Sequence, residues 1–180
     1  MCLVDGGANN GMAGEDMRLL AEAEIPETVD VIGPSDDVHD ELSNLKIGVY
    51  GGGLTTSAGV RVLGVFSNFI GYGKGKSILS LNQCAAFGHE VSERPRQYGG
   101  AQRIKTVDGY VFKLRCRRAL TYLPISYPTD DDIDELPCVQ MTSPCVWDPD
   151  DVNDGEDDDV WFDASDEEEL DEDEFLDSRD

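Results

Sequence analysis

The feature that most limits how this 180-residue chain can fold is an abrupt change of charge near residue 128. Residues 1–127 hold 13 Lys and Arg against 14 Asp and Glu, whereas residues 128–180 hold 1 against 24. A segment with so many like charges cannot bury enough apolar surface to offset its self-repulsion and its ordering entropy. We therefore expect one folded domain over residues 1–127, a Pro-rich linker over residues 128–148, and a disordered acidic tail over residues 149–180.

The same charge distribution limits the partners of the chain. An acidic tail repels nucleic-acid phosphates, so we expect no direct binding of DNA or RNA. No apolar run reaches the roughly twenty residues that cross a bilayer, and no signal peptide opens the chain, so we expect a cytoplasmic protein without membrane contact. The tail mixes acidic with aromatic residues, so it is either a solubilising tail or a segment that docks on a basic protein partner.

Cysteine and histidine give no sign of a metal site or a cofactor. The five cysteines are scattered, and none lies in a C-x-x-C pair, which predicts free thiols and no structural metal. The two histidines are His39 and His89, and no motif links either of them to a Ser or Cys nucleophile. We expect both to be ordinary surface or helix-capping side chains.

The folded part is predicted to be all-β and antiparallel. Residues 45–50 and 59–70 are rich in β-forming side chains. We expect the glycines at 51–53 and Thr55-Thr56-Ser57 to form a flexible hairpin connection between them. Residues 103–107 and 110–114 flank Asp108-Gly109, which predicts a hairpin with a type I′ turn. The helix–strand alternation that parallel sheets require is missing.

Smaller elements complete this prediction. Residues 12–25 are rich in Ala, Leu, Met and Glu, which favours a helix or a helical turn. Residues 28–33 alternate in the manner of a strand, and residues 115–125 predict one more strand. Residues 78–87 predict a strand that enters a short helix.

A carboxylate stands at the end of the first apolar run. Residues 1–4 predict a short buried strand, and Asp5 is followed at once by Gly6 and Gly7. Glycine has no Cβ, so it permits a tight turn and the close approach of another backbone. This arrangement holds an acid on a rigid turn, as a catalytic Asp requires, although Asp-Gly is also a common dipeptide of ordinary β-turns.

Four ordered motifs resemble the protease region of Copia-type retrotransposon polyproteins, and in particular the protease-like segments of Copia-related elements from diatoms and other algae. The first motif is Asp-Gly-Gly-Ala-Asn-Asn-Gly at residues 5–11, and the second is residues 73–83, which end in Ser-Leu-Asn-Gln. The third is Gly-Gly-Ala-Gln-Arg-Ile at residues 99–104, and the fourth is Trp-Asp-Pro at residues 147–149. The resemblance covers roughly residues 1 to 149.

The resemblance implies a retropepsin-like β barrel or sandwich with one or two short helices. It implies an aspartic endopeptidase that cleaves its own polyprotein, with Asp5 as the catalytic residue. Of two neighbouring carboxylates one activates water and the other donates a proton, and the second Asp comes from an identical subunit of a homodimer. The active-site turn is then Gly6, Gly7 and Ala8, and the flap candidate is the polar turn of Gly33, Pro34, Ser35 and Asp36.

Two departures from the family pattern weaken the expected activity. Gly6 stands where the family usually has Ser or Thr, whose hydroxyl braces the two active-site turns. The family also places a β-hairpin upstream of the Asp motif, so we expect an N-terminally truncated domain whose first strand is an exposed sheet edge. The alternative function is a catalytically inactive remnant that acts as a binding module through its acidic tail.

Two other readings of the sequence are weaker. Residues 71–77 resemble a phosphate-binding loop, but the loop is one residue too short and no βαβ unit surrounds it. Val107-Asp108-Gly109 repeats the tripeptide Val4-Asp5-Gly6 and could supply a second Asp from the same chain. The β-rich runs on both sides of Asp108 predict a hairpin tip instead.

Overall fold

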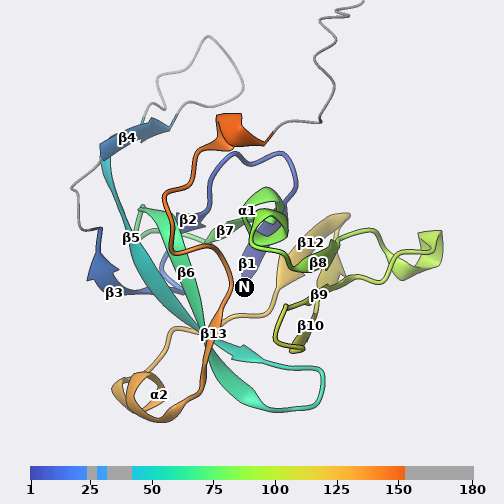
Figure 1. Ribbon diagram of the computed structural model, residues 1–180. Helices are drawn as coiled ribbons and strands as arrows, with labels where there is room; N and C mark the ends of the chain where they lie inside the picture. The colour runs from blue at the N-terminus through green and yellow to red at the C-terminus, as the bar shows by residue number, and fades with distance from the viewer. Residues whose placement is uncertain (24–27, 32–41, 153–180) are drawn as a thin grey trace, which may run out of the picture.

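The computed structural model describes residues 1–23, 28–31 and 42–152 (Figure 1). The flap candidate Gly33–Asp36, His39 and the tail from residue 153 onward lie outside the described residues. No helix in the described part of the chain is long and apolar enough to cross a membrane.

The described chain is mainly β-structure, as the sequence predicts, with two short α-helices and two single turns of 3-10 helix. The helical elements are α1 (Leu81–Ala86), α2 (Asp130–Glu135), η1 (Arg96–Tyr98) and η2 (Pro149–Asp151). The strands are β1 (Cys2–Asp5), β2 (Met12–Ala13), β3 (Arg18–Glu22), β4 (Thr28–Val31), β5 (Leu42–Thr55), β6 (Arg61–Gly71), β7 (Ile78–Ser80), β8 (Glu90–Ser92), β9 (Arg103–Lys105), β10 (Val111–Lys113), β11 (Arg115–Arg117), β12 (Leu120–Leu123) and β13 (Cys138–Gln140).

Ten of the described strands form one sheet, and β8, β9 and β10 form a second one. The path through the large sheet is β11-β12-β1-β7-β2-β6-β5-β3, with β13 paired to β6 and β4 paired to β5. This path has two ends, so the described strands do not close into a barrel. The expectation of a purely antiparallel sheet is wrong, because β1–β7, β2–β6 and β13–β6 are parallel pairs. Long connections between these partners supply the crossovers that parallel pairing needs.

Strand β1 lies inside the large sheet, which corrects the expectation of an exposed edge. It pairs antiparallel with β12, where Cys2 faces Leu123, and parallel with β7, where Asp5 faces Ser80. Both of its edges are therefore hydrogen-bonded.

The long strands β5 and β6 form the central hairpin of the fold (Figure 1). The glycines at 51–53 lie within β5, and the connection is formed by residues 56–60, where Thr56 N–H donates to the Val60 carbonyl at 2.9 Å. A Cβ on Gly52 would lie 2.1 Å from Ile125 Cδ1, and one on Gly53 would lie 2.7 Å from Ser126 Oγ. These glycines allow the segment after β12 to pack closely against β5, so their predicted role as a flexible connection was wrong. The other part of that prediction is confirmed, because Thr56 and Ser57 lie in the connection.

Residues 12–23, the described part of the helix expected over residues 12–25, do not form a helix. They contain β2, a turn and β3, and β3 pairs antiparallel with β5. Differences in helix propensity among ordinary residues amount to at most about 0.7 kcal/mol per residue, which sheet pairing easily overrides. Gly14 adds a steric reason, because its backbone lies against the 75–77 segment, where a Cβ would be 2.5 Å from the Gly75 carbonyl oxygen.

Residues 128–148 are not an extended linker. Helix α2 begins with a capping box between Thr129 and Asp132, and Arg61 of β6 donates two hydrogen bonds to the Asp132 carboxylate, at 3.1 and 2.8 Å. Strand β13 pairs with β6, and Val139 and Met141 are fully buried. The folded body therefore extends well beyond residue 127, because a short alternating apolar run among the prolines joins the core.

The predicted hairpin at residues 103–114 and the predicted strand at residues 115–125 differ from expectation in detail. Strands β9 and β10 pair as predicted, but only Gly109 of the Asp-Gly pair has a positive φ, so the turn is not type I′. Residues 115–125 contain two strands, β11 and β12, rather than one. Between them, Arg118 and Ala119 have φ values of 51° and 63°, in the left-handed region. Asn and Gly usually mark such a turn in a sequence, and neither is present at these two positions.

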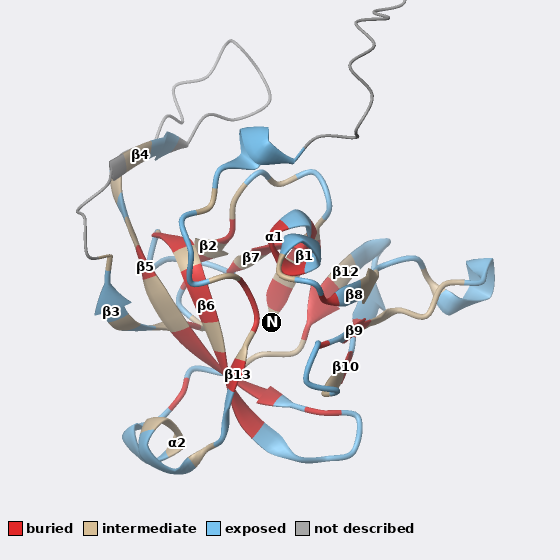
Figure 2. Cartoon of the chain, viewed as in Figure 1, coloured by how far each residue is buried: buried red, intermediate tan, exposed pale blue. Residues whose placement is uncertain are grey.

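The core lies around β1, β6, β7 and β13 (Figure 2). Along β6, Phe66 and Phe69 are fully buried, with ring centroids 5.2 Å apart. Leu79 of β7 and Leu123 of β12 are buried in the same cluster. The strand that carries Asp5 and the strand before α1 are thus both anchored in the core.

Candidate active site

The Asp5 carboxylate stands at the carboxyl end of β1, at the point where the strand leaves the core. Cys2 and Val4 are buried, with exposed fractions of 0% and 4%, whereas Gly6 and Gly7 are exposed. The strand therefore fixes the Asp5 backbone while the turn after it faces solvent. This is the placement that the apolar run and the two glycines predict.

The turn holds one oxygen of the carboxylate in place. Gly7 N–H donates to Asp5 Oδ1 at 2.8 Å. Within the described residues, no donor contacts the second oxygen, which leaves it free to meet water or a substrate. Asp5 is partly exposed, as an acid that acts on an external molecule must be.

The start of α1 supports the turn from the other side. Ser80 is fully buried at the end of β7, and its hydroxyl donates to the Ala8 carbonyl at 2.7 Å. The same hydroxyl accepts from Gln83 N–H and so caps α1. Asn82 donates from Nδ2 to the Gly6 carbonyl at 3.3 Å.

Gln83 fastens the far end of the loop that begins with Asp5. Its side chain is 2% exposed, and its Oε1 accepts from Gly11 N–H at 2.9 Å. Its Nε2 donates to Asn10 Oδ1 at 2.8 Å and to the Asn68 carbonyl at 3.3 Å. One buried amide therefore joins the Asp5 loop, α1 and β6.

Two further contacts close this loop. A Cβ on Gly11 would lie 2.2 Å from the Phe69 ring, so only glycine lets the loop pack on β6 at this point. Trp147 donates from Nε1 to the Asn9 carbonyl at 2.8 Å. Residues from the first, second and fourth resemblance motifs thus meet around one loop.

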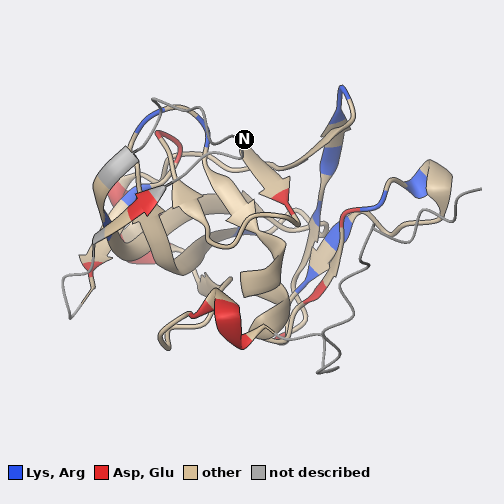
Figure 3. Ribbon diagram, turned by 90° about the horizontal axis from the view of Figure 1, so that it is seen from above, with Lys and Arg blue, Asp and Glu red and all other residues tan. Residues whose placement is uncertain are grey.

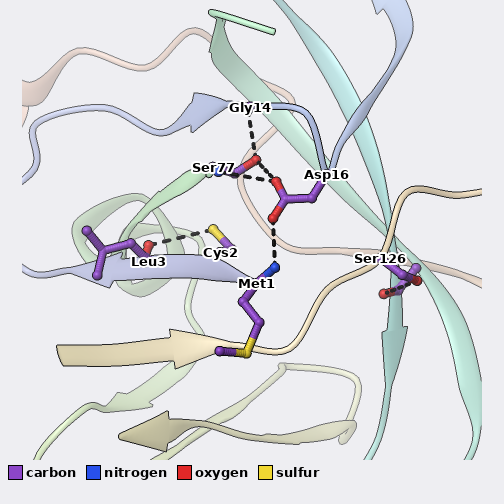
Figure 4. Close-up of polar contacts among 8 residues, drawn as sticks. Met1, Cys2, Leu3, Gly14, Asp16, Ser77 and Ser126 are labelled. Carbon is purple, nitrogen blue, oxygen red and sulfur yellow. Dashed lines mark hydrogen bonds and ion pairs between the residues drawn. The ribbon is translucent and has the colours of Figure 1, made fainter. Parts of the chain in front are cut away.

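A second polar cluster, of Met1, Gly14, Asp16 and Ser77, lies where β1 begins (Figure 4). The Asp16 carboxylate accepts from the Ser77 hydroxyl and, at 3.2 Å, from Ser77 N–H. Its other oxygen accepts from the Met1 amino group at 2.9 Å, and the Ser77 hydroxyl accepts from Gly14 N–H at 2.8 Å. Residues 71–77, the weak candidate for a phosphate-binding loop, therefore brace β2 against β7.

Glu93 lies near the Asp5 turn, and no pattern in the sequence predicted this position. Its Oε1 lies 3.0 Å from the place where a Cβ on Gly6 would stand. The space that a Ser or Thr side chain would enter at position 6 is therefore next to an acid. Asp108, by contrast, is at the tip of the β9–β10 hairpin in the small sheet, as the β-rich runs predict.

Cys2, Cys84 and His89, the buried thiols and imidazole of the fold, have structural roles. Burial raises the pKa of the Cys2 thiol and raises that of Cys84 to about 12, so both remain protonated at neutral pH. His89 is buried, which corrects the prediction of a surface or helix-capping side chain, and this burial lowers its pKa. Its Nδ1 accepts from Val107 N–H at 3.2 Å and its Nε2 lies 3.0 Å from the Gln140 carbonyl, so the neutral Nε2–H tautomer satisfies both contacts. Among the described residues, no group of three His, Cys, Asp or Glu side chains is arranged to hold a metal ion.

The sequence located the turn of Asp5, Gly6, Gly7 and Ala8 but not most of its supports. Ser80, Asn82 and Gln83 belong to a quoted motif, yet their bonds to the turn cross more than seventy residues and have no local signal. Neither the sequence nor the fold of this chain finds a match among protein-family models, curated proteins or solved structures.

Proposed function

We propose that this chain is an aspartic-endopeptidase-like protein of retrotransposon origin, with a retropepsin-like fold, that cleaves polyprotein peptides as a homodimer. One observation supports the proposal above all others. The first two of the four segments that resemble Copia-type proteases, far apart in sequence, are hydrogen-bonded to each other along the loop that begins with Asp5. The strand and short helix predicted over residues 78–87 are also present, as β7 and α1, which supports the proposal.

The chemistry requires two carboxylates that share one proton. In the proposed dimer Asp5 of one subunit meets Asp5 of the other across a two-fold axis. The ionised carboxylate takes a proton from water, and the protonated one donates to the scissile carbonyl. The exposure of Gly6 and Gly7 favours this arrangement, since the turn faces solvent, from which a second copy would approach.

The decisive experiment uses peptides of the chain's own polyprotein at mildly acidic pH. We expect cleavage by the wild-type chain and none by Asp5→Asn, which keeps the shape of the side chain but cannot ionise. Adding an excess of Asp5→Asn chain to a fixed amount of wild type should also reduce cleavage, because mixed dimers hold one acid only. Cleavage that survives Asp5→Asn, or no cleavage at any concentration and pH, refutes the proposal.

A second candidate is the inactive remnant that binds partners through its acidic tail. The environment of Gly6 favours it, because there is no hydroxyl to brace the turn and the Glu93 carboxylate lies beside the vacant space. This candidate predicts a monomer by sedimentation at micromolar concentration and no cleavage by wild type or by a Gly6→Ser variant. A wild-type dimer that cleaves peptides excludes it.

A further inference from the structure

A basic groove that none of the residues of the Asp5 turn lines lies between the connection of β5 to β6, the η1 turn and the strands β10 and β11. Its volume is about 880 Å³, and its lining includes Arg96, Lys113, Arg115 and Arg117. None of the described residues that line it is an Asp or a Glu. Figure 3 shows Lys and Arg gathered on the strands at the right of the molecule, where β9 to β12 lie.

These cations have no partner of opposite charge in the described part of the chain. The ion pairs there involve other cationic groups, such as Arg103 with Glu90 and Arg61 with Asp132. Arg115 and Arg117 stand on β11, which is the edge strand of the large sheet. Four uncompensated positive charges along one groove create a local potential that attracts a polyanion.

The chain carries such a polyanion in residues 153–180. This segment holds 16 Asp and Glu against one Arg over 28 residues. It also carries apolar side chains between its acids, among them Trp161, Phe162 and Phe175. The groove offers them Leu114 and Pro124 beside the cations.

The segment is long enough to reach the groove from Val152. At about 3.3 Å per residue, its 28 residues span about 90 Å when extended. A folded body of about 150 residues has a radius of gyration of only about 15 Å, so every point of its surface is within reach.

We propose that the groove lined by Arg96, Lys113, Arg115 and Arg117 is the docking site of the chain's own acidic residues 153–180. The Asp and Glu side chains pair with the four cations, and the aromatic side chains lie on the apolar part of the groove. The basic partner of the tail is therefore the body of the same chain, and other polyanions must displace the tail to reach the groove.

Cys116 gives a test in the full-length chain, because it lines the groove and its thiol is free and exposed. The comparison is with a variant in which the acids at 166–169 and 171–174 are replaced by Asn and Gln. At low salt, where charges are little screened, we expect a neutral alkylating reagent to modify Cys116 about fivefold more slowly in the wild type than in this variant. Cys138 and Cys145 are exposed and outside the groove, so they are internal references with unchanged rates. The difference at Cys116 should disappear at about 0.5 M NaCl, since salt screens the pairs. Equal rates at low salt overturn the proposal.

A pair of variants tests the groove itself. In the full chain, R115Q/R117Q should shift the tail amide resonances of residues 160–176, whereas K46Q/K74Q, which removes the same charge outside the groove, should leave them unchanged. A single-stranded oligonucleotide is the competing occupant. If it protects Cys116 of the wild-type chain at micromolar concentration while the tail substitutions have no effect, the groove is a nucleic-acid site and the proposal is wrong.

Discussion

Replacing Gln83 by Met tests whether one buried amide holds the loop of the candidate active site. Met keeps an unbranched side chain of similar length but can neither accept from Gly11 N–H nor donate to the Asn68 carbonyl. Gly11 is buried, so its N–H is left unsatisfied at a cost of about 1–3 kcal/mol, and the second lost bond adds about 1 kcal/mol. Asn10 is only half-buried and can turn to water. We expect the free energy of unfolding to fall by about 3 kcal/mol.

Urea denaturation followed by circular dichroism measures this change. The slope against urea should stay constant, because the core is kept, and the melting temperature should fall by about 6–12 °C for a body of this size. Asn82→Ala is the matched control, since its side chain is exposed and makes one bond of 3.3 Å to the same turn, so its effect should stay within about 0.5 kcal/mol. Native-state hydrogen exchange should show faster exchange at the Gly11 amide in the Met variant. A loss no larger than that of the control would refute the reasoning.

Three further predictions address the loop, the pH dependence and the extent of the body. Gly11→Ala should lower the free energy of unfolding, measured by thermal denaturation, by at least about 2 kcal/mol, because the new Cβ meets the Phe69 ring at 2.2 Å. Gly6→Ala should be nearly neutral, because its Cβ meets only the end of a flexible carboxylate. Burial lowers the pKa of His89, so the stability that its neutral form contributes is present above the usual His pKa of about 6.5 and is lost as pH falls below it. Replacing His89 by Gln should therefore flatten the decline of melting temperature between about pH 7 and 5. Cutting after Val152 in about 0.5 M NaCl should leave the melting temperature unchanged, but a cut that also removes β13 should abolish cooperative unfolding, because two fully buried side chains of the core are lost. A cooperative transition after the second cut would show that β13 is dispensable.

Local signals were sufficient where neighbouring residues determine the structure. The apolar run before Asp5 and the glycines after it predict a strand and a turn, and both are present. The strand that enters a short helix at residues 78–87 is also present, because Ser80, the residue just before α1, caps the helix by accepting from Gln83 N–H. These elements position the candidate carboxylate, so the core of the candidate site could be predicted from the sequence.

Signals failed where a partner distant in the sequence decides the structure. Residues 12–25 favour a helix locally, but β5 lies alongside them and pairs with β3. Gly52 reads as a turn residue, but Ile125 packs against it and leaves no space for a Cβ. Val139 lies among prolines in an acidic region, but β6 accepts its strand as a parallel neighbour. In each case the local sequence contains one residue of the contact, and nothing near it indicates which distant residue is the partner.

The charge analysis failed in a related way. Residues 1–127 sum to nearly zero, with 13 cations and 14 acids, and a sum of this kind describes the average of the surface rather than the field at any place on it. Folding places Arg115 and Arg117 beside Lys113 and Arg96 in one groove, while acids such as Asp132 and Glu90 are paired with other arginines. If the tail is far from the groove, the groove presents its positive charge to solvent and can bind a nucleic acid whatever the net charge of the chain. The net charge therefore excludes a nucleic-acid partner only when the tail lies near the cations. Tail docking is therefore what makes the sequence-based exclusion of nucleic acid consistent with a basic groove, and a chain without residues 153–180 should bind polyanions that the full chain rejects.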